Sequence, residues 1–275
     1  MNLLYIHWNI DPVFINLGFT ELRYYAILFV GGMLLGAYIV KRMFDKEGLN
    51  PDLIYTLAFY ILIGTVVGAR LGHCLFYQPE YYLIHPLEII LPIAKDASGS
   101  WHYSGFTGLA SHGGIIGVLV AAYLFVRKKR LSYLWLLDRI AIVGALAGCF
   151  IRIGNFFNSE IIGQPSTLPW AVVFEKVSDI PRHPAQLYEA LAYLMIFGLL
   201  MWLYKHKRAK LQDGFILGLF LILLFMARFF IEFLKERQVE FESSMTLDMG
   251  QLLSIPFILV GVLLVILKRP QKDIK

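Results

Sequence analysis

The chain has 275 residues, of which 58% are apolar, 15% aromatic and only 16% charged. Because a soluble domain carries about a quarter charged residues, this composition argues against a soluble protein with one large core and predicts a protein that crosses a membrane several times. The formal net charge is +5, but in such a protein the positions of the charges are more informative than their sum. Both cysteines, Cys74 and Cys149, lie inside apolar runs, so we expect no disulfide framework.

Seven segments are predicted to span the membrane, because a spanning helix needs roughly 20 mostly apolar residues. In chain order they are approximately 22–40, 53–76, 110–126, 134–156, 185–204, 214–234 and 248–267. The third is interrupted by Gly, Ser and His residues. A shorter apolar segment, 81–94, is broken by proline and is predicted to be re-entrant or interfacial. The chain is therefore predicted to be an all-α polytopic membrane protein, with one membrane-embedded domain over 1–275.

The basic residues predict the orientation. The loops after spans one, three, five and seven contain "KRMFDK", "RKKR", "KHKRAK" and "KRPQKDIK". The positive-inside rule then places the N-terminus outside and the C-terminus in the cytoplasm. The two long loops, about 78–109 and 157–184, face outward and are expected to form small extracytoplasmic caps, the second with a strand-like "WAVVFEKV". Three charged residues lie near span ends and can snorkel to the interface: Arg23, Asp138 and Arg139.

Further charged residues fall within the spans, namely Arg70, Arg152, Arg228 and Glu232. A central arginine costs about 2.5–3.5 kcal/mol on insertion scales, so each needs a partner, a water-filled cavity or a ligand. Arg228 can pair with Glu232 on one helix face, and Arg152, with no acid within a turn, can snorkel outward. Alternatively, Arg152 and Arg228 hold an anion between them near the outer surface, and a lipid phosphate matches the guanidinium fork. The two arginines together favour the phosphate site.

His112 opens the third span, near the outer face in this orientation. Taken alone, a histidine in an apolar context is most often a structural hydrogen bonder, although histidine is also the usual general base near neutral pH. The glycines after it, at 113, 114 and 117, allow another backbone or a lipid to approach closely. Tyr25, at the outer start of span one, is by default a member of an aromatic belt.

Five sequence elements, in this order along the chain, resemble one family, the prolipoprotein diacylglyceryl transferases. They are "HGGIIG" (112–117), "IRIGNFFNSEIIG" (151–163), "RHPAQLYE" (182–189), "RFFIEF" (228–233) and "MGQLLSIP" (249–256). Two departures occur. Ile151 replaces the first glycine of the family signature, and "LKERQ" stands where many members have an R-x-P-D stretch.

The resemblance implies an enzyme of the bacterial cytoplasmic (inner) membrane that performs the first step of lipoprotein maturation. Such enzymes transfer the diacylglyceryl group of phosphatidylglycerol to the lipobox cysteine thiol of a prolipoprotein signal peptide, which forms a thioether and releases glycerol 1-phosphate. The implied catalytic positions are His112, Arg152, Arg228 and Tyr25. The implied phosphatidylglycerol-binding positions are Arg152, Asn155, Glu160, Gly163 and Arg228.

The chemistry suits these residue types. A thiolate attacks far better than a thiol, so a histidine base helps, and arginines stabilise the charge that develops on a leaving phosphate. An arginine-lowered thiol pKa remains an alternative means of activation. No HExxH element and no cysteine cluster appear, so we expect no metal or other cofactor, and no nucleic-acid partner. Two other functions stay open: a transporter or channel for anionic lipids or solutes, which would not need His112, and another lipid enzyme such as a head-group phosphatase or a CDP-alcohol transferase.

Overall fold

The computed structural model describes residues 5–18, 21–91, 93–95, 101–103, 110–236 and 247–268. The chain divides into two compact units. The first comprises Met1–Met43 and Leu137–Lys275, and the second comprises Phe44–Leu136. Both are mostly helical, as the composition predicts, and the described strands are short.

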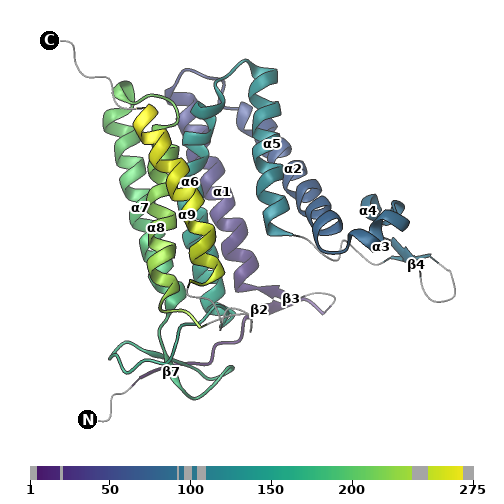
Figure 1. The fold of residues 1–275 in the computed structure, drawn as a ribbon, viewed down its shortest axis with the longest axis vertical. Coiled ribbons are helices and arrows are strands. Elements are labelled where there is room, and N and C mark those ends of the chain that lie inside the picture. The colour runs from purple at the N-terminus through teal and green to yellow at the C-terminus, as the bar shows by residue number, and fades with distance from the viewer. Residues whose placement is uncertain are drawn as a thin grey trace. The chain divides into compact units, whose positions relative to one another are not determined.

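Five long helices lie wholly or mainly in the first unit and run side by side (Figure 1). They are α1 (Tyr24–Lys46), α6 (Tyr133–Phe157), α7 (Ala185–Lys207), α8 (Phe215–Glu232) and α9 (Met249–Leu267), with a short 3-10 turn, η1 (Arg208–Lys210), after α7. Each is an apolar run that ends at polar or turn residues. The start of α9 is defined by a capping box between Asp248 and Gln251, which satisfies two backbone N–H groups of the first turn.

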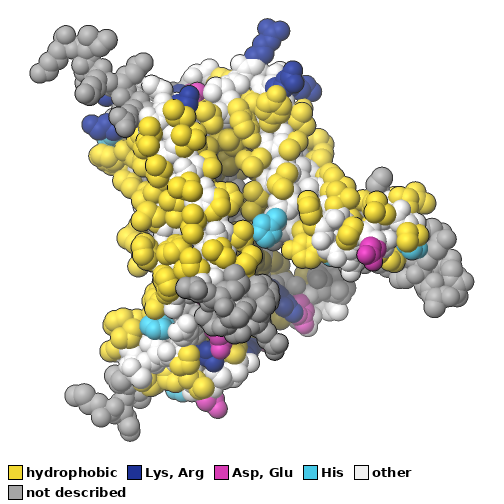
Figure 2. All heavy atoms as spheres, in the orientation of Figure 1, with side chains coloured by type: hydrophobic (Ala, Val, Ile, Leu, Met, Phe, Trp, Pro, Cys, Tyr) yellow, Lys and Arg dark blue, Asp and Glu magenta, His cyan; other side chains and the backbone are white. Residues whose placement is uncertain are grey.

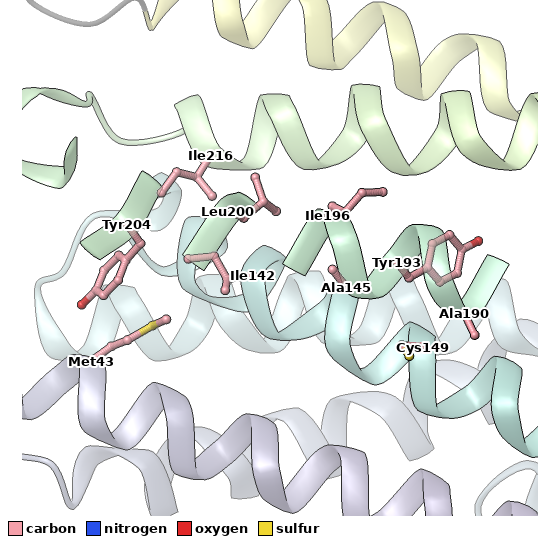
Figure 3. Packing of buried hydrophobic residues seen from close by; sticks show 10 residues of the cluster. All are labelled: Met43, Ile142, Ala145, Cys149, Ala190, Tyr193, Ile196, Leu200, Tyr204 and Ile216. Carbon is pink, nitrogen blue, oxygen red and sulfur yellow. The ribbon is translucent and has the colours of Figure 1, made fainter. Parts of the chain in front are cut away.

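The core of this unit is formed where α6 and α7 pack together, with contributions from α1 and α8 (Figure 3). Cys149 is one of its members and is buried and free, as is Cys74 in the second unit. A small residue of α6 meets a large one of α7: a Cβ atom added to Gly148 would lie 3.0 Å from Tyr193 Cδ2. The full cluster is Met43, Ile142, Ala145, Cys149, Ala190, Tyr193, Ile196, Leu200, Tyr204 and Ile216.

Two charged residues at the start of α6 are buried, which contradicts the expectation that they snorkel. The carboxylate of Asp138 accepts hydrogen bonds from the backbone N–H groups of Gly214 (2.8 Å) and Leu217 (2.7 Å). It therefore caps the N-terminus of α8, where the helix dipole favours a negative charge. The Arg139 guanidinium lies 5.7 Å from the centre of the Tyr204 ring, within cation–π range. The snorkelling prediction is wrong for both side chains.

Short strands gather at one end of the first unit's helices (Figure 1). β1 (Ile6–Trp8) pairs in parallel with β6 (Val172–Phe174), β6 pairs antiparallel with β7 (Pro181–Arg182), and β2 (Val13–Asn16) pairs antiparallel with β3 (Glu21–Arg23). β6 lies within the segment predicted to be strand-like. Trp8 packs 4.3 Å from the ring of Phe156, and Phe174 and Ile162 complete a small core. This core fixes the loop after α6 against the end of that helix.

In the second unit, α2 (Leu53–Phe76) and α5 (Ser111–Lys129) pack through glycines. Gly64, Gly68 and Gly72 recur at every fourth residue of α2 and meet Gly113 and Gly117 of α5. A Cβ atom added to Gly64 would lie 2.5 Å from the carbonyl oxygen of Gly117, and one added to Gly72 would lie 2.7 Å from Gly113 Cα. Side chains cannot occupy that space, so the backbones touch, as in small-residue packing of membrane helices. The predicted close approach at 113 and 117 is confirmed, with α2 as the partner.

The segment between these two helices contains no long helix among its described residues. It forms α3 (Pro79–Ile84), α4 (Leu87–Ile90) and the antiparallel pair β4 (Ile93–Lys95) and β5 (Trp101–Tyr103). The buried Arg70 of α2 donates to the carbonyl oxygens of Glu88 and Ile89, and its guanidinium lies 4.9 Å from the Tyr82 ring centre. This arginine therefore attaches α4 to α2, which gives it a structural role.

Among the described helices, six are long and apolar enough to cross a membrane: α1, α2, α6, α7, α8 and α9. They correspond to six of the seven predicted spans. α5 covers the third predicted span but is not among the six, because polar and basic residues occupy its two ends. Figure 2 shows hydrophobic side chains over the visible sides of the helices, and Leu34, Phe230 and Leu259 are exposed examples.

Candidate active site

Four of the predicted site residues lie at the end of the first unit where its helices meet the strands (Figure 1). Tyr25 is in the first turn of α1. Arg152 and Asn155 are in the last two turns of α6, and Arg228 is in the last two turns of α8. Three helices that are distant in sequence thus contribute polar side chains to one end of an otherwise apolar bundle.

Arg152 belongs to a buried ion pair. Its Nε lies 2.8 Å from Glu189 Oε2 of α7, and the two side chains are 12% and 0% exposed. Within the described residues Glu189 Oε2 has no well-aligned hydrogen-bond donor, so the contact is an ion pair rather than a directed hydrogen bond. The Arg152 Nη1 donates to Asn155 Oδ1 at 3.3 Å. An acid on a neighbouring helix, rather than snorkelling, accounts for the burial of this guanidinium.

Glu189 is shared between two cations. Its Oε1 accepts a hydrogen bond from Lys235 Nζ at 3.0 Å and lies 3.4 Å from the donating hydroxyl of Tyr193. Lys235 Nζ also donates to Glu232 Oε2 at 3.0 Å, and the Lys235 and Glu232 side chains are 4% and 15% exposed. Buried charges persist when they are paired, and here the charges alternate in one network: Arg152, Glu189, Lys235 and Glu232.

Arg228 is half-buried and, among the residues that the structure describes, has no hydrogen-bond or ion-pair partner. Glu232, one turn further along α8, pairs with Lys235 instead. The alternative in which Glu232 neutralises Arg228 is therefore wrong. Glu232 is in turn connected to Arg152 through Lys235 and Glu189. The two guanidinium groups thus share one neighbourhood, and among the described residues only Arg152 has an ion-pair partner there.

Glu160 follows α6 in a loop that turns back onto the helix. Its carboxylate accepts hydrogen bonds from the side-chain amides of Asn155 and Asn158, both at 3.1 Å. Its backbone carbonyl accepts one from Gln186 Nε2 at 2.6 Å. The turn requires a positive φ of 55° at Ser159, which costs free energy for a residue with a side chain. These bonds hold Asn155 and Glu160 in one arrangement at the end of α6.

Gly163 is packed closely against His183 and Leu234. A Cβ atom at this position would lie 2.5 Å from both Cβ and the carbonyl oxygen of His183 and 2.8 Å from the carbonyl oxygen of Leu234. Its N–H donates to the His183 carbonyl at 3.0 Å, and it forms an isolated β-bridge with Lys235. The glycine therefore joins the loop after α6 to the residues that follow α8, and to Lys235 in particular.

Tyr25 packs directly against the site helix. A Cβ atom on Gly154 would lie 2.7 Å from Tyr25 Cδ2, and the Tyr25 ring is stacked with that of Phe29 at 6.3 Å. Gly154 lies between Arg152 and Asn155 in the sequence. A glycine is required there because the tyrosine ring occupies the space of a side chain.

His112 belongs to the second unit, in the first turn of α5, where its side chain is exposed. The glycine after it, Gly113, contacts α2. The resemblance groups His112 with the residues of the first unit, and that grouping remains a prediction.

The first-unit residues can attract an anion. Three positive groups (Arg152, Arg228 and Lys235) and two negative ones (Glu189 and Glu232) leave one positive charge in excess. Glu160 also lies nearby, but its side chain is exposed, so solvent and salt screen its charge. Guanidinium groups donate in a planar fork that suits phosphate oxygens, and a partly desolvated site strengthens the attraction.

Three members of this arrangement were not predicted from the sequence: Glu189, Lys235 and Tyr193. Glu189 stands in an unusually polar start of a spanning helix, and an arginine without a local acid implies a distant one. Lys235 follows the sixth predicted span, where no local sequence pattern gives it a role. Lys235 and Glu189 are 46 residues apart, so no helical spacing relates them.

The comparisons with known proteins agree with the motifs. Residues 12–267 match the family model described as prolipoprotein diacylglyceryl transferase. Proteins named phosphatidylglycerol–prolipoprotein diacylglyceryl transferase are similar over nearly the whole chain. That of Bacteroides fragilis is 45% identical and covers 99% of each chain. That of Tolumonas auensis is 48% identical, over 97% of this chain and 99% of its own, and that of Chloroherpeton thalassium is 44% identical, over 95% and 93%. The chain belongs to the prolipoprotein diacylglyceryl transferase family.

Proposed function

We propose that this protein transfers the diacylglyceryl group of phosphatidylglycerol to a cysteine thiol of a prolipoprotein, the first step of bacterial lipoprotein maturation. Membership of the family and the names of its relatives support the reaction. The observation that carries the site assignment is the buried network of Arg152, Glu189 and Lys235. Arg228 lies near this network and has no ion-pair partner within the described part of the chain. Burying these charges in an apolar helical bundle costs free energy, and such residues in membrane spans usually mark a ligand site.

The proposed topology has seven spans in the bacterial cytoplasmic membrane, with α5 as the third. A helix lined by glycines on its contact with α2 fits a membrane setting despite its polar ends. The basic residues at the ends of α1, α5 and α7 support a cytoplasmic location for those ends. The N-terminus and the strands at the site end of the first unit are then outside, and the loops 78–109 and 157–184 form caps there.

In this proposal Arg152 and Arg228 bind the phosphate of the lipid. The ester phosphate gains negative charge as the bond between the glycerol carbon and the phosphate oxygen breaks. Donors already fixed in place stabilise that charge better than mobile water does, and Glu189 and Asn155 fix Arg152. Asn155, Glu160 and Gly163 belong to the same binding site: the first two orient the glycerol hydroxyls or the arginines, and the third keeps the loop in place.

The nucleophile is the lipobox cysteine of the substrate, so the chain's own buried cysteines are not needed. His112 accepts the proton of that thiol, the sulfur forms a bond to the glycerol carbon, and glycerol 1-phosphate leaves with the electron pair of the broken C–O bond. Histidine is the side chain that most often performs this proton transfer near neutral pH. Tyr25, packed against Gly154, lies beside the phosphate-binding residues and completes the proposed catalytic set.

A product assay tests the proposal. The purified protein is incubated with phosphatidylglycerol and a lipobox peptide, and the products are analysed by mass spectrometry. We expect the diacylglyceryl thioether of the cysteine and one glycerol 1-phosphate for each peptide modified. A peptide in which serine replaces the cysteine is the control. Release of inorganic phosphate or diacylglycerol without a thioether would indicate a head-group hydrolase, and lipid movement without any product would indicate a transporter.

A further inference from the structure

We infer that Lys235 is a positioning residue for the phosphate site: by sharing the charge of Glu189, it leaves the Arg152 guanidinium available to an anionic ligand. The inference deepens the proposed function and rests on it. It assigns a role to a lysine whose location, just beyond the end of α8, gave no indication of one.

The contacts of Lys235 are unusual for a lysine. Its side chain is 4% exposed, and its Nζ lies 3.0 Å from Glu189 Oε1 and 3.0 Å from Glu232 Oε2. Its backbone is also held, since its N–H donates to the Glu232 carbonyl and its carbonyl accepts from Gln164 Nε2 at 3.1 Å. The β-bridge with Gly163 fixes it further. Both the main chain and the ammonium group of Lys235 are therefore located precisely.

Electrostatics give this location a consequence. Glu189 is fully buried and contacts Arg152 through one oxygen and Lys235 through the other. If Lys235 carried no charge, the whole charge of Glu189 would compensate Arg152, and the five groups would sum to zero instead of one positive charge. Because solvent screens buried charges poorly, an approaching phosphate would be attracted less. Lys235 thus acts on the ligand through Glu189 and Arg152 without touching it.

A purely structural role for Lys235 predicts a different result. Loss of a structural ion pair reduces the amount of folded enzyme or its turnover rate, and leaves the affinity for the phosphate-bearing ligands unchanged. A positioning role changes the affinity for the phosphate-bearing ligands and leaves the affinity for the peptide unchanged. It also predicts rescue when the partner charge is removed, because replacing both members of a buried pair is often tolerated while breaking the pair is not.

The test compares three variants with the wild-type protein: Lys235→Arg, Lys235→Met, and Lys235→Met combined with Glu189→Gln. Lys176→Met is the matched control, because Lys176 is exposed in the loop before β7. For each, thermal unfolding in detergent reports folding. Thioether formation gives the KM for phosphatidylglycerol, the KM for the lipobox peptide and the inhibition constant of glycerol 1-phosphate.

We expect Lys235→Met to raise the KM for phosphatidylglycerol and the inhibition constant of glycerol 1-phosphate about tenfold or more, within the range of coupling between contacting charges. The KM for the peptide should stay within about twofold of wild type, because the phosphate that the site binds belongs to the lipid and not to the peptide. Lys235→Arg keeps the charge and should remain within about threefold of wild type for all three constants. The double variant restores the net charge and should recover most of the lost affinity for glycerol 1-phosphate.

Several outcomes would overturn the inference. One is a Lys235→Met protein that binds glycerol 1-phosphate as tightly as the Lys176→Met control. Another is a double variant that folds but binds as weakly as Lys235→Met does. If Lys235→Met does not fold, the double variant decides alone: wild-type affinity supports the inference, and a tenfold loss contradicts it. A wild-type protein that forms no thioether overturns the proposed function itself, which a failure confined to the Lys235 variants does not.

Discussion

Replacement of Gly163 by alanine adds one methyl group at a position where the structure leaves no room for it. The new Cβ would lie 2.5 Å from two atoms of His183 and 2.8 Å from the carbonyl oxygen of Leu234, whereas ordinary contacts begin near 3.4 Å. Two of these three atoms are backbone carbonyl oxygens in hydrogen-bonded segments, so they cannot rotate away. Overpacking of this kind costs about 1–3 kcal/mol, or roughly 5- to 150-fold in an equilibrium between correctly and incorrectly packed forms.

The effect on activity should exceed the effect on stability, because the Gly163 bridge also holds Lys235. Thermal unfolding of the detergent-purified variant and thioether formation per folded molecule measure the two effects separately. Gly198→Ala is the matched control. It makes the same change within α7, where the new Cβ atom would meet nothing within 4 Å beyond the backbone of its own helix and alanine favours the helix by about 0.5–1 kcal/mol. If Gly163→Ala has the same unfolding temperature and the same rate of thioether formation per folded molecule as Gly198→Ala, the added methyl group does not clash and the explanation is wrong.

Three further predictions concern topology, the cysteines and the base. With the native cysteines replaced, a membrane-impermeant thiol reagent outside the cell should modify Ser178→Cys and spare Lys207→Cys, and the reverse pattern would overturn the orientation. Replacement of both Cys74 and Cys149 by alanine should leave turnover within a few-fold of the parent. A lipid adduct on either cysteine during turnover would mean that the enzyme's own thiol, and not that of the substrate, is the nucleophile. His112→Gln should lower turnover about 100- to 10,000-fold, measured as thioether formed at saturating lipid, and a rate near wild type would exclude it as the base.

Much of the helical architecture could be predicted from the sequence, because it depends on local composition. The apolar runs that became α1, α2, α6, α7, α8 and α9 are long enough to be recognised one at a time. The third predicted span differs because its helix is stabilised by contact with another helix. Gly113 and Gly117 make α5 less apolar, and the same glycines let it pack on α2.

The polar partners could not be predicted in the same way. Arg152 has no acid within a turn of its own helix, and its partner Glu189 comes from another helix. The i,i+4 rule suggested that Arg228 pairs with Glu232, but Lys235 competes for the same carboxylate from a loop. Asp138 shows the same limit, since its role is to cap a helix that begins far away in the sequence.

Motifs were more informative than periodicity about the site. The signature that contains Arg152, Asn155, Glu160 and Gly163 also contains Gly154. The structure explains why this position is a glycine, because the Tyr25 ring occupies the space that a side chain would fill. Sequence patterns therefore pointed to residues that the structure brings to one end of the first unit, while Glu189, Lys235 and Tyr193 became evident only from the structure. The roles of the individual residues in catalysis remain predictions.

In the proposed site two guanidinium groups stabilise the phosphate that leaves with glycerol, and the turnover of lysine variants measures that stabilisation. Arg152→Lys and Arg228→Lys each keep the charge, but one ammonium cannot reproduce a planar fork of donors. At Arg152 it also cannot serve Glu189 and Asn155 together as Nε and Nη1 do. Loss of a preorganised donor costs about 2.7–4 kcal/mol, or 100- to 1000-fold in rate, and we expect that loss in thioether formation for each variant at matched protein levels. Arg127→Lys, at an exposed position near the end of α5, is the control. Turnover within about threefold of wild type for both Arg152→Lys and Arg228→Lys would contradict the claim.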